Sequence, residues 1–192
     1  MRFGREPKGV VAFALLSIRA RVAVRGGGDS GSVCRTRRLH SCSGCPHFRV
    51  MASNTCNFVV GRLLEIRVAA GYRSVTDVDG MIGMMQGQVS RLPVDDKYII
   101  AADWRAVHIM SPETSTRARA MMAKSNPRVT RSAILTLPEE STTNLQVLRI
   151  VREAENAARR HFTTAPEMHR WLSEVLTTQE ARRLASFLGL AP

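Results

Sequence analysis

The residues best able to bind a metal lie close together near the start of the chain. They are Cys34, His40, Cys42, Cys45 and His47, all within fourteen residues. Thiolate and imidazole are preferred ligands of zinc, and Cys42-x-x-Cys45 has the spacing of half a zinc site. Such sites usually contain a second pair of ligands with similar spacing on the other side of a loop. The sequence contains no second pair of this kind for CSGC. CSGC also lacks the strand and helix that surround a redox-active Cys-x-x-Cys pair. We therefore predict neither a metal site nor a redox site here.

The segment that carries this cluster differs in composition from the rest of the chain. Residues 1–50 contain ten basic and two acidic residues, whereas residues 51–192 contain eighteen and fourteen. Its Gly/Ser-rich part, Arg25–Ser32, has linker chemistry, and regular apolar periodicity is missing from Arg19 to Cys56. We predict that residues 1–53 form a disordered basic arm. The break in composition also supports the hypothesis that translation begins at Met51.

A second group with potential chemistry ends the strongly apolar segment Lys97–Trp104. Asp103, Trp104 and Arg105 would lie at the carboxyl end of a buried central strand, where open α/β sheets place their ligand crevices. Asp103 is then a candidate to bind a ligand or to act as an acid or base. The alternative is a carboxylate that caps a helix or pairs with Arg105, because one carboxylate alone rarely makes a mechanism. His108 has no neighbour at metal-ligand spacing and is expected in a loop.

Helix-start patterns predict the elements that hold these residues. A Ser or Thr followed three residues later by an acidic or amide side chain satisfies the free N–H groups of a first turn, and Pro favours the first helical position. Helices are expected to begin at Ser74, Ser111, Thr143, Thr164 and Thr177. The helix from Thr143 is expected to run to Arg160, with Arg149, Arg152, Arg159 and Arg160 on a solvated face.

Apolar runs between these helices predict the strands, which are expected at 57–69, 97–104, 129–137 and 161–164. The first contains a candidate hairpin around Gly61. In it Leu64, Ile66 and Val68 alternate with Glu65 and Arg67, the pattern of a half-buried strand. Strand and helix alternate throughout, so we expect a single α/β domain over 54–190 with one mixed, mostly parallel sheet covered by helices.

Four segments, GRLLEIRV, IIAADWR, RSAILTL and RRHFTTAPEMHRWL, occur in this order of elements. Together they resemble the STAS domain, in particular the bacterial SpoIIAA-like group, over about Phe58–Leu176. The resemblance implies the fold of an anti-sigma-factor antagonist and a regulatory, non-catalytic role in a bacterial cytoplasm. Residues 177–190 lie outside it and are expected to add a C-terminal helix.

The resemblance also singles out Ser111. Antagonists of this family switch when a Ser or Thr is phosphorylated at the start of the helix after the central strand, where helix amides stabilise a phosphate. Ser111 has that position and is a candidate phosphorylation site. The family's Asp-Ser/Thr-Gly signature is absent, because seven residues without glycine separate Asp103 from Ser111. A plain N-cap is the alternative.

The resemblance implies that a protein partner is recognised through the loop and helix start 106–116. Candidate residues for this surface are Asp103, Trp104, Arg105, His108 and Ser111. A small-molecule or lipid-binding domain is one alternative, and an enzyme using Asp103 is another. A roomy pocket bounded by Asp103 and Trp104 would favour a ligand, whereas a filled core with an exposed patch would favour a protein.

Several other classes are not expected. The chain has no cofactor or catalytic motif of the Walker, Gly-x-Gly-x-x-Gly, Gly-x-Ser-x-Gly or His-Glu-x-x-His type. Its positive charge is concentrated in the arm, and two tryptophans and two tyrosines provide little base stacking, so we predict no nucleic-acid binding by the domain. The apolar run Val10–Ile18 is nine residues long, half of a membrane span.

Overall fold

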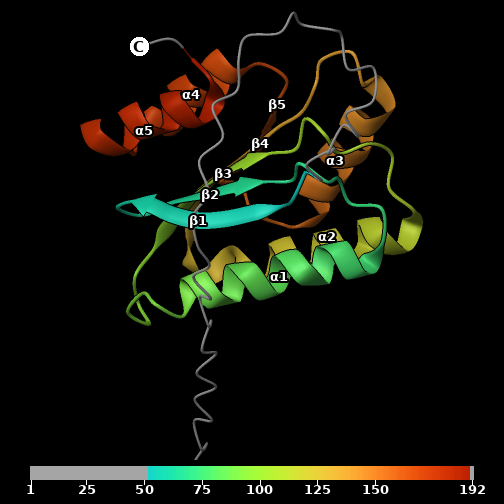
Figure 1. Cartoon of the computed structure of the whole chain (residues 1–192), viewed down its shortest axis with the longest axis horizontal. Coiled ribbons are helices and arrows are strands. Elements are labelled where there is room, and N and C mark those ends of the chain that lie inside the picture. The colour runs from blue at the N-terminus through green and yellow to red at the C-terminus, as the bar shows by residue number, and fades with distance from the viewer. Residues whose placement is uncertain (1–51, 191–192) are drawn as a thin grey trace, which may run out of the picture. The chain divides into compact units, whose positions relative to one another are not determined.

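In the computed structural model, residues 52–190 form an α/β unit whose described part contains one five-stranded sheet and five α-helices. Figure 1 shows the sheet between two layers of helices. The coarse prediction of an α/β fold with a mixed, mostly parallel sheet is confirmed. The predictions on residues 1–51, including the Cys/His cluster, the basic arm and the start at Met51, lie outside the described residues.

The five strands lie side by side in the sheet in the same order as in the sequence. They are β1 (Thr55–Val60), β2 (Leu63–Arg67), β3 (Tyr98–Asp103), β4 (Val129–Leu135) and β5 (Arg159–Phe162). The first two pair antiparallel as the expected hairpin, and Gly61 at φ 54° allows its tight turn. β2 to β5 pair parallel.

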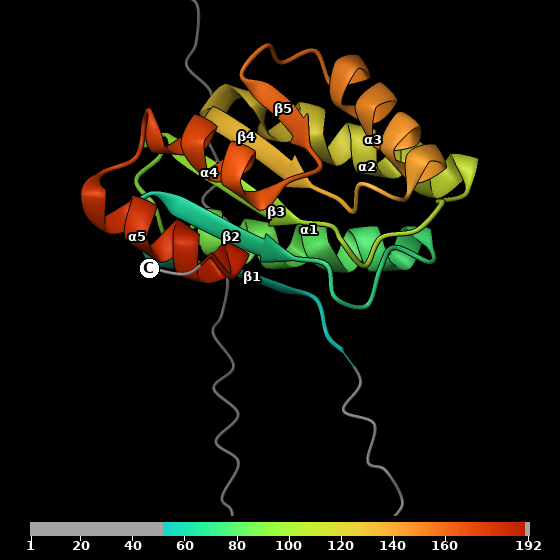
Figure 2. The same ribbon diagram turned by 90° about the horizontal axis from the view of Figure 1, so that it is seen from above.

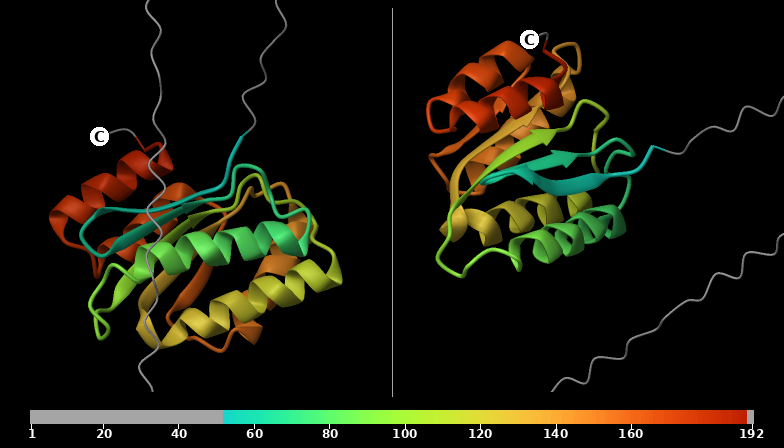
Figure 3. Two further views of the ribbon diagram at one scale, coloured as in Figure 1. Left: turned by 60° about the horizontal axis from the view of Figure 1, so that its bottom comes forward. Right: turned by 60° about the vertical axis from the view of Figure 1, so that its left-hand side comes forward.

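Chain order explains why three helices share one face. The helices α1 (Val75–Val89), α2 (Pro112–Ser125) and α3 (Ser141–Glu153) each connect two successive parallel strands. Right-handed crossovers that always step in the same direction across a sheet place their helices on the same side. The buried residues of all three helices accordingly pack in one core cluster. Figure 3 shows α1 and α2 running side by side beneath the sheet.

Two further helices cover the opposite face of the sheet. They are α4 (Ala165–Ser173) and α5 (Thr178–Leu188), which pack against each other and lie over the strands in Figure 2. α5 is the added C-terminal helix that the sequence predicts. It belongs to the domain core, because Leu184, Phe187 and Leu188 are buried with Leu63 and Ile99 of the sheet.

Three of the predicted helix starts are confirmed by hydrogen bonds. The Oγ of Ser74 accepts from the backbone N–H of Asp77, and Thr177 makes the same contact with Glu180. In both cases the acidic side chain bonds back to the cap N–H, which completes a capping box. Ser111 caps α2 by accepting from the N–H of Thr114 at 3.2 Å.

The predicted long helix from Thr143 to Arg160 is wrong at both ends. α3 begins at Ser141 and stops at Glu153, and Glu155 adopts a left-handed conformation at φ 52°. The chain must turn there so that the following residues can pair with β4. The side chain of Asn156 stabilises this turn by accepting from Ala158 N–H at 2.9 Å. Strand pairing thus overrides the helix preference of the alanines.

Two charged residues expected at the surface are buried. Glu65 was expected to face solvent on a half-buried strand, but α5 covers that face, and Glu65 pairs with Arg183 through two hydrogen bonds of 2.7 and 2.6 Å. Arg159 was expected on the solvated face of a helix. It begins β5 instead and points into the core.

No helix within residues 52–190 is long and apolar enough to cross a membrane.

Candidate functional site

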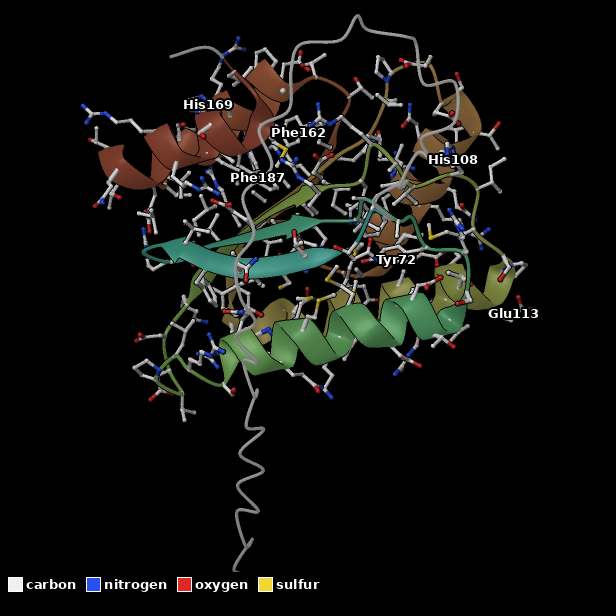
Figure 4. The ribbon with its side chains drawn as sticks, in the orientation of Figure 1. Tyr72, His108, Glu113, Phe162, His169 and Phe187 are labelled. Carbon is white, nitrogen blue, oxygen red and sulfur yellow. The ribbon has the colours of Figure 1, made fainter. Side chains whose placement is uncertain are left out.

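The carboxyl ends of β3, β4 and β5 meet at one edge of the sheet, where α/β folds place their ligands. The loop after β3 rises from this edge and leads into α2. All five candidates from the sequence lie on this strand end and loop, and Figure 4 shows His108 and Glu113 at that end of the molecule.

Asp103 is held by two arginines. Its carboxylate accepts from Nε and Nη2 of Arg105 at 2.9 and 2.8 Å, and Nε of Arg67 lies 3.6 Å from Oδ2. Burial alone would raise the pKa of Asp103, but the hydrogen bonds and charge of the two arginines outweigh burial and hold the pKa below its usual value. The carboxylate therefore stays ionised at neutral pH, and both of its oxygens accept hydrogen bonds from Arg105. This arrangement fits the predicted alternative, in which Asp103 pairs with Arg105.

Trp104 lies in the core rather than on the surface. Its side chain turns to the face covered by α1 and α2, where its ring packs edge-on against Tyr72 with centroids 5.1 Å apart. Figure 4 shows Tyr72 on that side of the sheet, opposite Phe162 and Phe187. Neighbouring residues of a strand face opposite sides, so Asp103 and Trp104 do not line one pocket.

The loop after β3 is hydrogen-bonded to a side chain of α3. Gln146 accepts from the backbone N–H of Met110 at 2.9 Å and donates to its carbonyl at 2.9 Å. Val107 and Met110 are buried beneath the loop. His108 and Ile109 point outward, and His108 lies 3.6 Å from the carboxylate of Glu140. The loop thus presents a fixed outer surface.

Ser111 stands exposed at the start of α2. Besides capping the helix, its hydroxyl donates to Oγ1 of Thr114 at 3.1 Å. The first turn also contains Glu113, whose pKa is lowered chiefly by the hydrogen bond that its carboxylate accepts from its own backbone N–H. A phosphate on Ser111 would gain the helix N–H groups but would meet this carboxylate, so the local charge is mixed.

A hydrogen-bonded trio that the sequence analysis missed lies at the same edge. Thr136 follows β4, His161 lies in β5, and Asn144 lies in α3. The amide nitrogen of Asn144 donates to the carbonyls of Leu137 and Pro138, so its oxygen faces the hydroxyl of Thr136. That hydroxyl donates its one hydrogen to Asn144, so it can only accept from Nε2 of His161, 2.7 Å away, which requires the tautomer with the hydrogen on Nε2.

This proton arrangement does not activate a nucleophile. A histidine base would have to accept the hydroxyl proton, whereas His161 donates to Thr136. Burial lowers the pKa of His161, which keeps the ring neutral at pH 7. The trio therefore joins β4, β5 and α3. Sequence spacing could not reveal it, because the three residues belong to separate elements.

Within residues 52–190, no three His, Cys, Asp or Glu residues are grouped so that they could hold a metal ion. Comparison with protein-family models and with curated proteins finds no match to this chain.

Proposed function

We propose that this chain is a STAS-like, non-catalytic regulatory module that recognises a protein partner through the loop after β3 and the start of α2. The observation that carries the proposal is a pair of exposed apolar side chains, Ile109 at 65% and Leu145 at 69% exposure. Each directly precedes one member of the Gln146–Met110 contact. The two side chains thus come from a loop and a helix that are joined by two hydrogen bonds.

Rigidity favours binding by such a surface. A loop that is already fixed loses little conformational entropy when a partner docks, which improves affinity without additional contact area. Ile109 directly follows the exposed His108 and comes two residues before the exposed Ser111, in keeping with the apolar centre and polar rim of protein interfaces. Phosphorylation of Ser111 would add about two negative charges to that rim and change its preference for a partner.

The surroundings of Asp103 support the non-catalytic proposal over the enzyme alternative. The carboxylate of Asp103 is bound by Arg105 and Arg67, and its pKa is lowered rather than raised toward neutrality. Small-molecule binding is the second candidate function. It is favoured by a groove that lies away from this edge, between α1 and α2.

The setting we propose is a bacterial cytoplasm, in line with the group that the sequence resembles. Cys56, the free thiol among residues 52–190, is buried. A domain core that contains a reduced thiol suits a reducing compartment.

The proposal is tested by capturing partners of the full-length chain from a cell lysate, with quantitative mass spectrometry. Ile109→Asp places a charge at the centre of the proposed surface. The matched control is Val94→Asp, because Val94 is an exposed apolar residue in the turn before β3, away from the loop. A partner should be retained by Val94→Asp and lost by Ile109→Asp. If every captured protein binds both variants equally, the proposed surface is refuted.

The switch is tested separately with Ser111→Glu against Ser111→Ala. Both variants remove the hydroxyl, but only the first adds a negative charge. Different partner profiles for the two support control by phosphorylation. Identical profiles leave Ser111 with its capping role alone.

A further inference from the structure

A groove runs between α1 and α2 on the face of the unit opposite α4 and α5. The cavity in it has a volume of about 640 Å³, within the range of small-molecule sites. Figure 3 shows the two helices side by side. The apolar lining comes from Ile82, Met85, Val89, Tyr98 and Met121.

Gly83 adds no side chain to the wall of this groove. It lines the groove, and a Cβ built on it would meet no atom within 4 Å. The glycines of α1 could have served close packing against the sheet, but Gly80 and Gly87 also face open space. An exposed glycine inside a helix costs about 1 kcal/mol relative to alanine. At Gly83 the missing side chain leaves free space in the groove that a ligand can fill.

A small inner cavity of about 20 Å³ lies against the sheet and shares part of its wall with the groove. Met85, Met121 and Ser125 line both spaces. A volume of this size holds about one water-sized group. The two methionines have flexible side chains that adapt to irregular ligands. They can therefore change rotamer to let a ligand group pass from the groove into the inner cavity.

The inner cavity is lined by a buried arginine without an acidic partner. Arg159 is 6% exposed and bonds to neutral acceptors, namely Ser132, Ser125, Asn126 and the carbonyl of Met122. Within residues 52–190 it forms no salt bridge, and its Nε has no hydrogen-bond partner. Burial lowers its pKa to about 10. A cation taken out of water in this way is stabilised by an anion that reaches its free N–H.

Two more residues that line the same inner cavity each contain a buried polar atom without a partner among the described residues. These atoms are the hydroxyl of Tyr72 and the indole Nε1 of Trp104. Both side chains are more than nine-tenths buried. Buried polar groups normally have hydrogen-bond partners. Three buried donors without partners within residues 52–190, on Arg159, Tyr72 and Trp104, therefore indicate that a group with hydrogen-bond acceptors binds at this cavity.

The mouth of the groove carries positive charge. Lys124 and Arg128 line it and form no ion pair within residues 52–190, whereas Arg117 is neutralised by Asp79 at 2.6 Å. Arg128 donates to the carbonyls of Pro93 and Asp96. An anion approaching the groove is therefore attracted before it reaches the buried Arg159.

We propose that this groove binds an aliphatic carboxylate, a fatty-acid-like molecule whose chain lies between α1 and α2 and whose carboxylate reaches Nε of Arg159 past Ser125. The single negative charge matches Arg159, the buried cation that lines the inner cavity. The chain matches the apolar walls. This site is independent of the partner surface on the loop after β3, and either can be wrong without the other.

The test is isothermal titration calorimetry of the full-length protein with dodecanoate, kept below the concentration at which it forms micelles. Dodecan-1-ol, which has the same chain without the charge, is the comparison ligand. Dodecanoate should bind at least about tenfold more tightly, since a charged hydrogen bond contributes more than a neutral one. Equal affinity for the two ligands, or no binding of dodecanoate, overturns the proposal.

Three variants locate the site. Gly83→Leu fills the groove and should weaken dodecanoate binding at least about tenfold. Gly80→Leu is its matched control, since it gives the same gain in helix preference on α1 outside the groove lining, and it should leave the affinity within about twofold. Lys124→Met removes one of the two charges at the mouth and should lower the preference for dodecanoate over dodecan-1-ol by no more than about threefold, because Arg159 still binds the carboxylate. Equal losses in the two glycine variants would place binding elsewhere, and loss of the preference in Lys124→Met would refute the role of Arg159.

Discussion

Glu180 fastens the last helix to the β1–β2 hairpin, and its replacement by alanine should destabilise the domain by about 3 kcal/mol. Its side chain is buried at 2% exposure. Oε2 accepts from the backbone N–H of Thr177 at 2.8 Å, which closes the capping box of α5. Oε1 accepts from the backbone N–H of Arg62 in the hairpin turn at 2.7 Å. One carboxylate thus satisfies two backbone donors that lie 115 residues apart in the sequence.

The magnitude follows from these two contacts. Loss of a helix cap costs about 0.5–2 kcal/mol. A buried donor left without its acceptor, here the N–H of Arg62, costs about 1–3 kcal/mol. The central sum of about 3 kcal/mol corresponds to a fall in melting temperature of roughly 6–12 °C for a chain of this size. Urea unfolding followed by circular dichroism measures the free energy directly.

Glu174→Ala is the matched control, because Glu174 is an exposed glutamate that pairs with Arg131 at 2.8 Å. It should cost less than about 1 kcal/mol. A Cβ on Gly61 would collide with the Glu180 carboxylate, so Gly61→Ala should cost less in the Glu180→Ala background than in the wild type. Equal costs for the two glutamate variants, or strict additivity with Gly61→Ala, would refute this role of Glu180.

The same carboxylate should make stability depend on pH. Burial alone would raise the pKa of Glu180, but hydrogen bonds from Thr177 and Arg62 outweigh it and hold the pKa below its usual value. Its contribution is therefore complete above the ordinary glutamate pKa of about 4.3 and is lost as the pH falls through the lower folded value. The difference between wild type and Glu180→Gln should shrink at acidic pH. A difference that stays constant from pH 7 to pH 3 would contradict this assignment.

Three further outcomes are expected. Gly80→Ala should raise the free energy of unfolding by about 1 kcal/mol, because Gly80 is exposed within α1 and an added Cβ meets no atom within 4 Å; no gain in urea unfolding would mean that α1 is frayed there. Cys56 should resist alkylation in the folded protein, since burial raises its pKa to about 12, and peptide mapping should show it labelled only after unfolding; rapid native labelling would contradict its burial. Asp103→Asn should cost about 1–2 kcal/mol at pH 7, because Arg105 loses its ionised partner; a variant as stable as the wild type would show that the pair contributes nothing.

Local patterns in the sequence predicted the starts of α1, α2 and α5 well. A capping box such as Ser74 with Asp77 involves residues three apart, so its geometry depends little on the rest of the chain. The central strand was equally readable, because every residue from Tyr98 to Asp103 is buried and the sequence there is almost continuously apolar.

Predictions failed where long-range pairing competed with local preference. The alanines after Glu153 favour helix, yet Glu155 turns the chain so that Arg159 can pair beside Ser132 of β4. Glu65 has the pattern of a solvent-facing residue until α5 supplies Arg183, 118 positions later. Helix and strand patterns depend on residues a few positions apart. They therefore contain no information about the turn at Glu155 or the burial of Glu65.

The candidate sites divide in the same way. Asp103, Arg105, His108 and Ser111 could be named from the sequence because a strand end and a helix start fix their place in an α/β fold. The Thr136–His161–Asn144 trio and the groove above Arg159 could not, since each draws its residues from separate elements. The sequence alone determined the order of elements, the caps of α1, α2 and α5 and the class of sheet, which rest largely on contacts between near neighbours. Only the tertiary structure decided which charges are buried, which glycine lines a groove and which polar groups lack partners, because burial depends on helices and strands that meet across the whole domain.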